Sequence, residues 1–201
     1  MVAPSRIPQT ASMQDDDEYD LEYETQGEPN IRRRALILRC LIEAAYGADR
    51  TEIVAWLEAQ ELIESVAPSE LAFFEAKKPK EQQVINASWR TEALEAIMWA
   101  LGELPTMTPS SDSASLASIT EAMPEFLEDC NDFLNSETMR DESAIYDECE
   151  KIHDQHWSIR DAQINKKPIP NGLDSGVVRE KHYALNWILY SEPWDEVETD
   201  T

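Results

Sequence analysis

Apolar residues recur every three or four positions along most of the chain from Pro29 onward, which is the spacing of one face of an α-helix. The first stripe consists of Ile31, Ala35, Leu38, Ile42 and Ala45. Gly47 follows this stripe and predicts the end of the first helix. Asp49 precedes Glu52 by three residues, the spacing of a capping box, and predicts the start of a second helix.

The same periodicity continues to the end of the chain, broken only by loops. Six further helices are predicted over 68–78, 81–104, 116–122, 125–134, Ser136 to about Asn165, and Asp174 or Ser175 to Tyr190. Residues 105–115 form a loop by composition, and no hairpin signal or internal repeat occurs. The helix over 81–104 has the widest apolar face, so we expect it at the centre of the core. The pattern predicts an all-α, single-domain bundle of about seven helices.

The N-terminal region follows a different pattern from the rest of the chain. Residues 1–28 are rich in Pro, Ser, Gln and Asp and show no helical periodicity. Such a composition buries too little apolar surface to offset the entropy of ordering. We therefore expect residues 1–28 to form a disordered acidic arm and residues 29–201 to form one helical domain.

Charge is concentrated in three acidic segments. The formal net charge is −24, from 41 acidic and 17 basic residues. Residues 15–24 hold seven acids and no base, residues 121–150 hold eleven acids and one base, and residues 190–201 hold five acids and no base. Like charge repels phosphate, so this balance argues against a nucleic-acid or membrane-surface partner and favours a basic protein. The partner-facing acids are expected to be Glu121, Glu125, Glu128, Asp129, Asp132, Asp141 and Glu142.

Composition excludes several further classes of protein. No Gly-x-x-x-x-Gly-Lys-Ser/Thr or Gly-x-Gly-x-x-Gly motif occurs, and we expect no cofactor. Cys40, Cys130 and Cys149 form an odd, sparse set without Cys-x-x-Cys spacing, which is typical of a reducing compartment. No apolar signal-peptide region and no apolar run of membrane-spanning length occurs. We expect a cytoplasmic protein, and its oligomeric state stays open.

A second group of residues combines aromatic, basic, acidic and imidazole side chains. Its members are Trp89, Arg90, Glu92, Trp99, Trp157, Arg160, Asp161, Glu180, His182, Asn186 and Trp187. Glu180, His182 and Asp161 are the catalytic candidates, because a carboxylate beside an imidazole orients it and raises its basicity. The binding candidates are Arg90, Glu92, Trp157, Arg160, Asn186 and Trp187. The favoured alternative is structural ion pairing, and Arg90 and Glu92, two residues apart, must each find a partner on another helix.

Cys149, His153 and His156 lie at i, i+4 and i+7 of the predicted long helix. Cysteine and histidine suit zinc, but seven residues of helix rise about 10 Å, too far for Cys149 and His156 to share one ion. His153 and His156 are therefore weak metal candidates, and core packing is favoured. Trp194, a single large aromatic in an acidic ending, is expected to fill an apolar groove.

Four motifs carry a resemblance to a known family. They are WRTEALEAIMWALG (89–102), HWSIRDA (156–162), GVVREKHYALNW (176–187) and WDEVETDT (194–201). In this order, over residues 30–201, they resemble a large bacterial family described only as a domain of unknown function. The resemblance implies a mostly helical fold and a bacterial intracellular setting, and it implies no activity, substrate or catalytic residue.

Three functions remain open from the sequence. The leading one is a protein-binding module, of the immunity type in which an acidic protein faces a basic toxin or other basic partner. The alternative is a small-molecule or metal-dependent enzyme with a cleft between the Trp-rich helices. The third is a scaffold or oligomer without a ligand.

Overall fold

The computed structural model describes residues 25–200, and this part of the chain contains helices and no β-strand. Its α-helices are α1 (Glu28–Ala45), α2 (Arg50–Ala59), α3 (Pro68–Glu75), α4 (Glu81–Ala100), α5 (Leu116–Thr120), α6 (Asn131–Leu134), α7 (Glu142–Ile164) and α8 (Ser175–Tyr190). Three short 3-10 helices are η1 (Ile63–Ser65), η2 (Pro170–Gly172) and η3 (Trp194–Glu196). The all-α, single-domain prediction is confirmed, with eight α-helices among the described residues rather than about seven.

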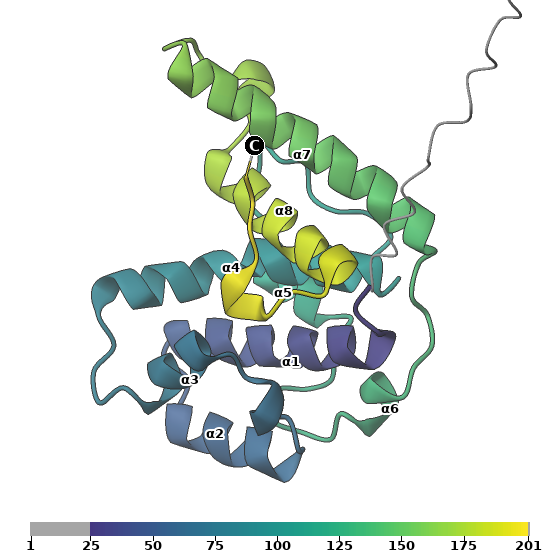
Figure 1. The fold of residues 1–201 in the computed structure, drawn as a ribbon. Coiled ribbons are helices and arrows are strands. Elements are labelled where there is room, and N and C mark those ends of the chain that lie inside the picture. Colours follow the sequence, from purple (N-terminus) through teal and green to yellow (C-terminus); the bar gives the residue numbers. More distant parts are fainter. Residues whose placement is uncertain (1–24, 201) are drawn as a thin grey trace, which may run out of the picture.

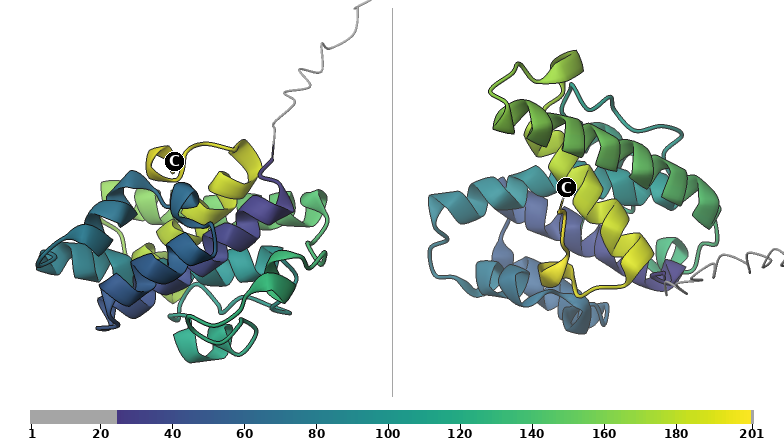
Figure 2. Two further views of the ribbon diagram at one scale, coloured as in Figure 1. Left: turned by 90° about the horizontal axis from the view of Figure 1, so that it is seen from below. Right: turned by 45° about the horizontal axis from the view of Figure 1, so that its top comes forward.

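The four long helices stack in the order α1, α4, α8, α7. Helix α4 packs against α1 and against α8, and α8 in turn packs against α7 (Figure 1). Helices α2 and α3 lie against α1 on the side away from α7, as the views in Figures 1 and 2 show together. Ala93, Leu94, Ala96 and Ile97 of α4 are completely buried. The predicted central position of this helix is therefore confirmed.

Aspartates start two of the helices, as predicted. The Asp49 carboxylate accepts hydrogen bonds from the backbone N–H groups of Thr51 and Glu52 at the start of α2. Asp174 accepts from Gly176 and Val177 at the start of α8. Each carboxylate satisfies two backbone donors that the first helical turn leaves unpaired.

The predicted helix over 125–134 is wrong over most of its length, since only α6 (Asn131–Leu134) is helical. Leu127 has a φ of 62°, which an α-helix excludes. Side chains of neighbouring helices bind the backbone here: Arg39 of α1 donates to the Pro124 carbonyl, and Trp56 of α2 donates to that of Glu128. These long-range bonds replace the local helical ones.

The predicted cap at Ser136 is also wrong. Helix α7 begins at Glu142 after Asp141, and residues 136–140 are not helical. The Arg140 guanidinium donates to the carbonyls of Trp99 and Leu104, at 2.7 and 2.8 Å, where α4 ends. Arg140 therefore caps the end of α4, and residues 136–140 do not extend α7 towards the N-terminus.

Three arginines of α1 are buried, a feature that the apolar stripe did not predict. Arg32 pairs with Glu28 at 2.9 Å and with Glu103 at 3.0 Å, and Arg34 pairs with Glu70 at 2.7 Å. Arg39 contacts the Pro124 carbonyl. Removing one partner of a buried pair leaves a charge uncompensated, so these contacts tie α1 firmly to distant segments.

The predicted arm lies mostly outside the described residues, since only its last four residues are described. Among these, Gln26 N–H donates to the Ile188 carbonyl at 2.7 Å, and Glu28 opens α1. No helix within residues 25–200 has both the length and the apolar character needed to cross a membrane.

Candidate functional site

Arg90 and Glu180 form the joint between α4 and α8. Their side chains meet at 2.8 Å, and the Arg90 guanidinium also lies over the ring of Tyr183, 4.4 Å from its centroid. Glu180 is buried. The prediction that Arg90 finds its partner on another helix is confirmed. The Glu180 carboxylate is committed to this guanidinium rather than to His182.

Glu92 and Glu95 of α4 hold the loop 105–115 against the helices. Glu92 accepts from the N–H of Ala114 at 3.0 Å, and Glu95 accepts from the N–H of Thr108 at 3.0 Å. Lys181 of α8 pairs with Glu95 at 2.8 Å and donates to the Thr108 carbonyl at 2.5 Å. Three buried charged side chains therefore fix the path of this loop.

Burial raises the pKa of Glu92 from 4.5 to about 7, and the Ala114 N–H opposes this rise only in part. Glu92 is therefore a carboxyl that still holds its proton near neutral pH. The prediction that Glu92 finds its partner on another helix is wrong, because its partner is the N–H of Ala114 in a loop.

Glu95 and Lys181 were not among the predicted site residues. A signal for Lys181 existed: it shares the apolar stripe of Val177, Ala184 and Ile188, so a helical wheel places it in the core. A lysine that is completely buried requires a partner, and the sequence does not show which carboxylate supplies it.

His182 and His156 form a buried pair, with their Nδ1 atoms 3.0 Å apart and one ring N–H donating to the other ring. The ring of His153 lies 5.5 Å from that of His182. Burial and the neighbouring histidines lower the pKa of His182 to about 4. The pKa of His156 is lowered mainly by burial and, to a smaller extent, by the positive charge of Arg160. The two rings are neutral at neutral pH.

The structure does not bring the catalytic candidates Glu180, His182 and Asp161 into contact with one another. The imidazole of His182 contacts His156, Glu180 contacts Arg90, and the Asp161 carboxylate accepts from the Asn165 amide at 2.7 Å. Each candidate has a structural partner of its own.

No group of three or more His, Cys, Asp or Glu side chains within residues 25–200 is arranged to hold a metal ion. Burial raises the pKa of Cys149 to about 12, which disfavours the thiolate that a metal needs. Its thiol instead donates to the Asn186 amide oxygen at 3.2 Å.

The C-terminal segment folds back over α8, and Trp194 anchors it. Trp194 is buried edge-on against Trp187, with ring centroids 5.4 Å apart. The Arg34 guanidinium lies 4.7 Å from the ring centroid of Trp194. Asp195 accepts from the N–H and the hydroxyl of Ser69, at 2.8 and 2.6 Å, at the start of α3. The predicted anchoring role of Trp194 is confirmed, and Trp187 is part of the same cluster.

The remaining binding candidates lie apart from these clusters. Trp157 and Arg160 are exposed on the outer face of α7, and the Trp157 side chain is 56% exposed. Asn186 donates to the Glu198 carbonyl at 2.9 Å, which helps to hold the C-terminal segment. Arg160 and Trp157 therefore face solvent rather than a cleft.

All seven predicted partner-facing acids are exposed. They follow one another along the segment 121–142, which is held to the body by Arg39, Trp56 and the α6 core residue Phe133. The acidic residues thus lie along one exposed segment whose backbone is bonded to α1 and α2.

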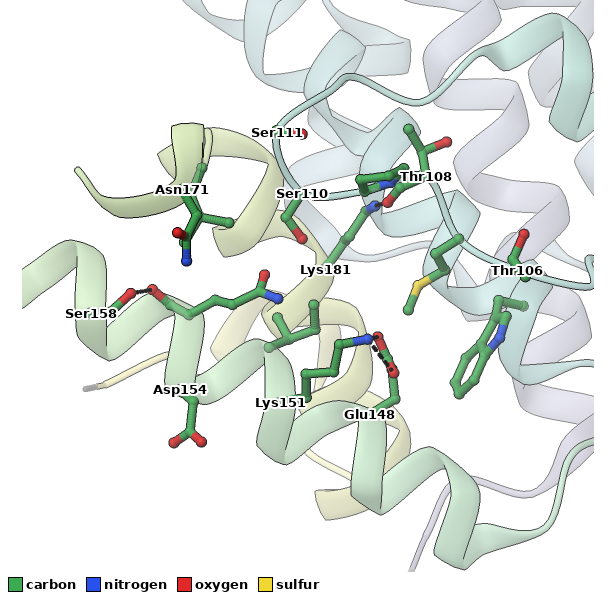
Figure 3. Close-up of a pocket in the computed structure, with 16 residues that line it drawn as sticks. Thr106, Thr108, Ser110, Ser111, Glu148, Lys151, Asp154, Ser158, Asn171 and Lys181 are labelled. Carbon is green, nitrogen blue, oxygen red and sulfur yellow. Dashed lines mark hydrogen bonds and ion pairs between the residues drawn. The ribbon is translucent and has the colours of Figure 1, made fainter.

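A cavity of about 680 Å³ lies between residues 106–111, α7 and η2, with Lys181 of α8 in its lining (Figure 3). Trp99 of α4 lines it, whereas Glu180 and His182 do not. This cavity therefore differs from the predicted cleft with Glu180 and His182, and its polar lining comes from other residues. Ser110 and Gln155, which also line it, were not predicted.

The chain matches a family model over residues 9–197. It belongs to the family described as "Domain of unknown function (DUF4272)". The resemblance inferred from the four motifs is thus confirmed for the DUF4272 family. No curated protein and no solved structure matches the chain. A function for this DUF4272 chain must therefore be argued from its own geometry.

Proposed function

We propose that this DUF4272 chain is a protein-binding module whose acidic surface, residues 121–142, engages a basic protein. The observation that carries the proposal is the exposure of all seven acids on this one segment. A surface patch whose charges share one sign raises the rate of encounter with a partner of opposite charge, and it repels proteins of like charge. Nucleic acid is not a proposed partner, since its phosphates carry the same sign as this surface.

Rigidity of the acidic surface supports the same proposal. Arg39 holds the Pro124 carbonyl, and Trp56 holds the Glu128 carbonyl at 3.1 Å. A surface that is already ordered loses little conformational entropy on binding. The charges are therefore presented in one arrangement rather than on a flexible tail.

Two exposed aromatic residues extend the surface along α7, which begins where the acidic segment ends. Tyr146 is 48% exposed and Trp157 is 56% exposed. They are three helical turns apart on one face, separated by about 16 Å along the axis. Exposed Tyr and Trp often supply most of the energy of a protein interface. We propose that Tyr146 and Trp157 anchor the partner beside the acidic surface.

An immunity-type role, in which the chain neutralises a basic toxin, is the specific form of this proposal. Such pairs depend on fast, electrostatically steered association. The proposed compartment is the cytoplasm, and the three free cysteines, all buried, support it. The enzyme alternative stays a prediction, but its candidates Glu180 and His182 already have structural partners.

Affinity capture with matched variants tests the proposal. The neutralised variant carries Glu121→Gln, Glu125→Gln, Glu128→Gln, Asp129→Asn, Asp132→Asn, Asp141→Asn and Glu142→Gln. A control of equal charge change carries Glu52→Gln, Glu58→Gln, Glu61→Gln, Glu64→Gln, Glu75→Gln, Glu81→Gln and Asp112→Asn, all exposed positions elsewhere.

Wild type and the control should capture the same basic protein from the lysate of the producing cells at low salt, and the neutralised variant should not. His182→Ala should also keep the partner. Capture of that protein by the neutralised variant, or its loss with His182→Ala alone, would contradict the proposal and favour the enzyme alternative.

A further inference from the structure

We propose that the cavity between residues 106–111, α7 and α8 is a binding site for a neutral, hydroxyl-rich small molecule, of the size of a mono- or disaccharide. This site is separate from the acidic surface. Four features carry the inference: fixed walls, lysines that are already paired, a buried polar atom without a partner, and an aromatic side chain in the lining. The cavity volume of about 680 Å³ lies within the range of known small-molecule sites.

The walls of the cavity are already in place without a ligand. Glu95 and Lys181 both bind the backbone of Thr108, and Glu92 binds the N–H of Ala114 further along the same loop. The Ser110 carbonyl accepts from the N–H of Asp174, which joins the loop to the start of α8. A ligand therefore enters a site that needs little ordering.

Both lysines of the lining are already paired with carboxylates. Lys181 is completely buried and already paired with Glu95, which lies behind the cavity. Lys151 is paired with Glu148 at 3.0 Å, and Asp154 adds a negative charge near the opening. No unpaired cation is left for a phosphate or a carboxylate among the described lining residues. An uncharged ligand suits this lining best.

Polar side chains line the cavity from three segments. The Gln155 Oε1 atom is buried and has no hydrogen-bond partner in the structure. Figure 3 shows Ser110 and Asn171 on the same side of the cavity, and the side chains of both line it. An amide accepts and donates, and so does a hydroxyl, so these groups suit a ligand that carries several hydroxyls. A ligand hydroxyl would supply the donor that Gln155 lacks.

Trp99 and Met107 give the cavity an apolar part of its lining. The Arg140 guanidinium lies 4.8 Å from the Trp99 ring centroid and donates to the Trp99 carbonyl, which fixes the position of this residue. A sugar ring combines a polar edge with an apolar face of C–H groups. It matches a lining that contains both amides and an indole.

Calorimetry and saturation-transfer NMR on the full chain test this assignment. The probes are D-glucose, N-acetyl-D-glucosamine and maltose, with glucose 6-phosphate and glucosamine as charged comparators. At least one neutral sugar should bind, and its charged counterparts should bind at least tenfold more weakly.

Gln155→Leu keeps the size of the side chain and removes its amide, so it should weaken binding at least tenfold. Gln163→Leu, the same change at an exposed position of the same helix, should leave binding unchanged. Ser110→Ala serves as a second variant if Gln155→Leu lowers the melting temperature, and it should also weaken binding.

Three results would overturn the assignment. They are an absence of binding by all three neutral sugars, tighter binding of a charged comparator, and equal affinity of the Gln155→Leu and Gln163→Leu variants.

Discussion

Replacing Glu92 with glutamine should stabilise the protein at alkaline pH and leave its stability nearly unchanged at acid pH. Glu92 is 3% exposed, and its carboxylate oxygens accept from the N–H of Ala114. Burial raises the pKa of Glu92 to about 7. Lys181 lowers this pKa and Glu95 raises it, but both remain in the variant.

The direction and size of the effect follow from proton linkage. An unfolded glutamate releases its proton near pH 4.5, whereas folded Glu92 keeps its proton until about pH 7. Between these values the folded state holds more protons, so the free energy of unfolding falls as the pH rises. The free energy of unfolding falls by about 3 kcal/mol in total, which is ~1.4 kcal/mol for each pH unit between the unfolded and folded pKa values. Glutamine accepts the same N–H without a charge, so the variant avoids this loss.

Urea unfolding followed by circular dichroism measures the difference between the two proteins. At pH 4.5 the two free energies should agree closely, and at pH 8.5 the variant should be more stable by about 3 kcal/mol. Glu121→Gln, the same change at an exposed position, should show no such trend. A Glu92→Gln difference that is constant with pH, or a variant less stable than wild type at pH 8.5, would refute the reasoning.

The remaining predictions concern three other buried groups. An NMR titration of His182 should give a pKa near 4, because burial and the neighbouring histidines disfavour its charged form, and a midpoint near 6.5 would contradict this. Trp194→Ala should lower the free energy of unfolding by about 3–5 kcal/mol, and exposed Trp157→Ala by less than about 0.5 kcal/mol. Equal losses would argue against the anchoring role of Trp194. Lys181→Met should cost about 3–5 kcal/mol by leaving Glu95 unpaired, and adding Glu95→Gln should restore most of it. A double variant as unstable as Lys181→Met would exclude the pairing argument.

The sequence predicted the features that depend on neighbours along the chain. The wide apolar face of 81–104 indicated the central helix, because helical periodicity is a local property. The caps at Asp49 and Asp174 were found for the same reason, since a cap bonds two or three residues ahead.

Features that depend on distant residues were missed. The pattern at 125–134 resembled a helix, but Arg39 and Trp56 bind its backbone from α1 and α2, and Leu127 adopts a positive φ. Asp141 rather than Ser136 precedes α7, because Arg140 is occupied with the end of α4.

The candidate residues were identified more reliably by type than by partner. Glu180 and His182 are both buried, and their partners Arg90 and His156 are 90 and 26 residues away in the chain. The cavity draws on five segments of the chain, and no spacing along a single segment indicates such a lining.

The association rate between the chain and its captured basic partner tests the central claim most directly. Stopped-flow measurements at 50, 150 and 500 mM NaCl compare wild type with the variant neutralised across 121–142 and with the control of equal charge change. The account predicts a wild-type rate that falls steeply with salt, because screening shortens the reach of exposed charges. The control should keep most of this dependence, and the neutralised variant should associate slowly at every salt concentration. A wild-type rate independent of salt, or equal rates for wild type and the neutralised variant, would contradict the account.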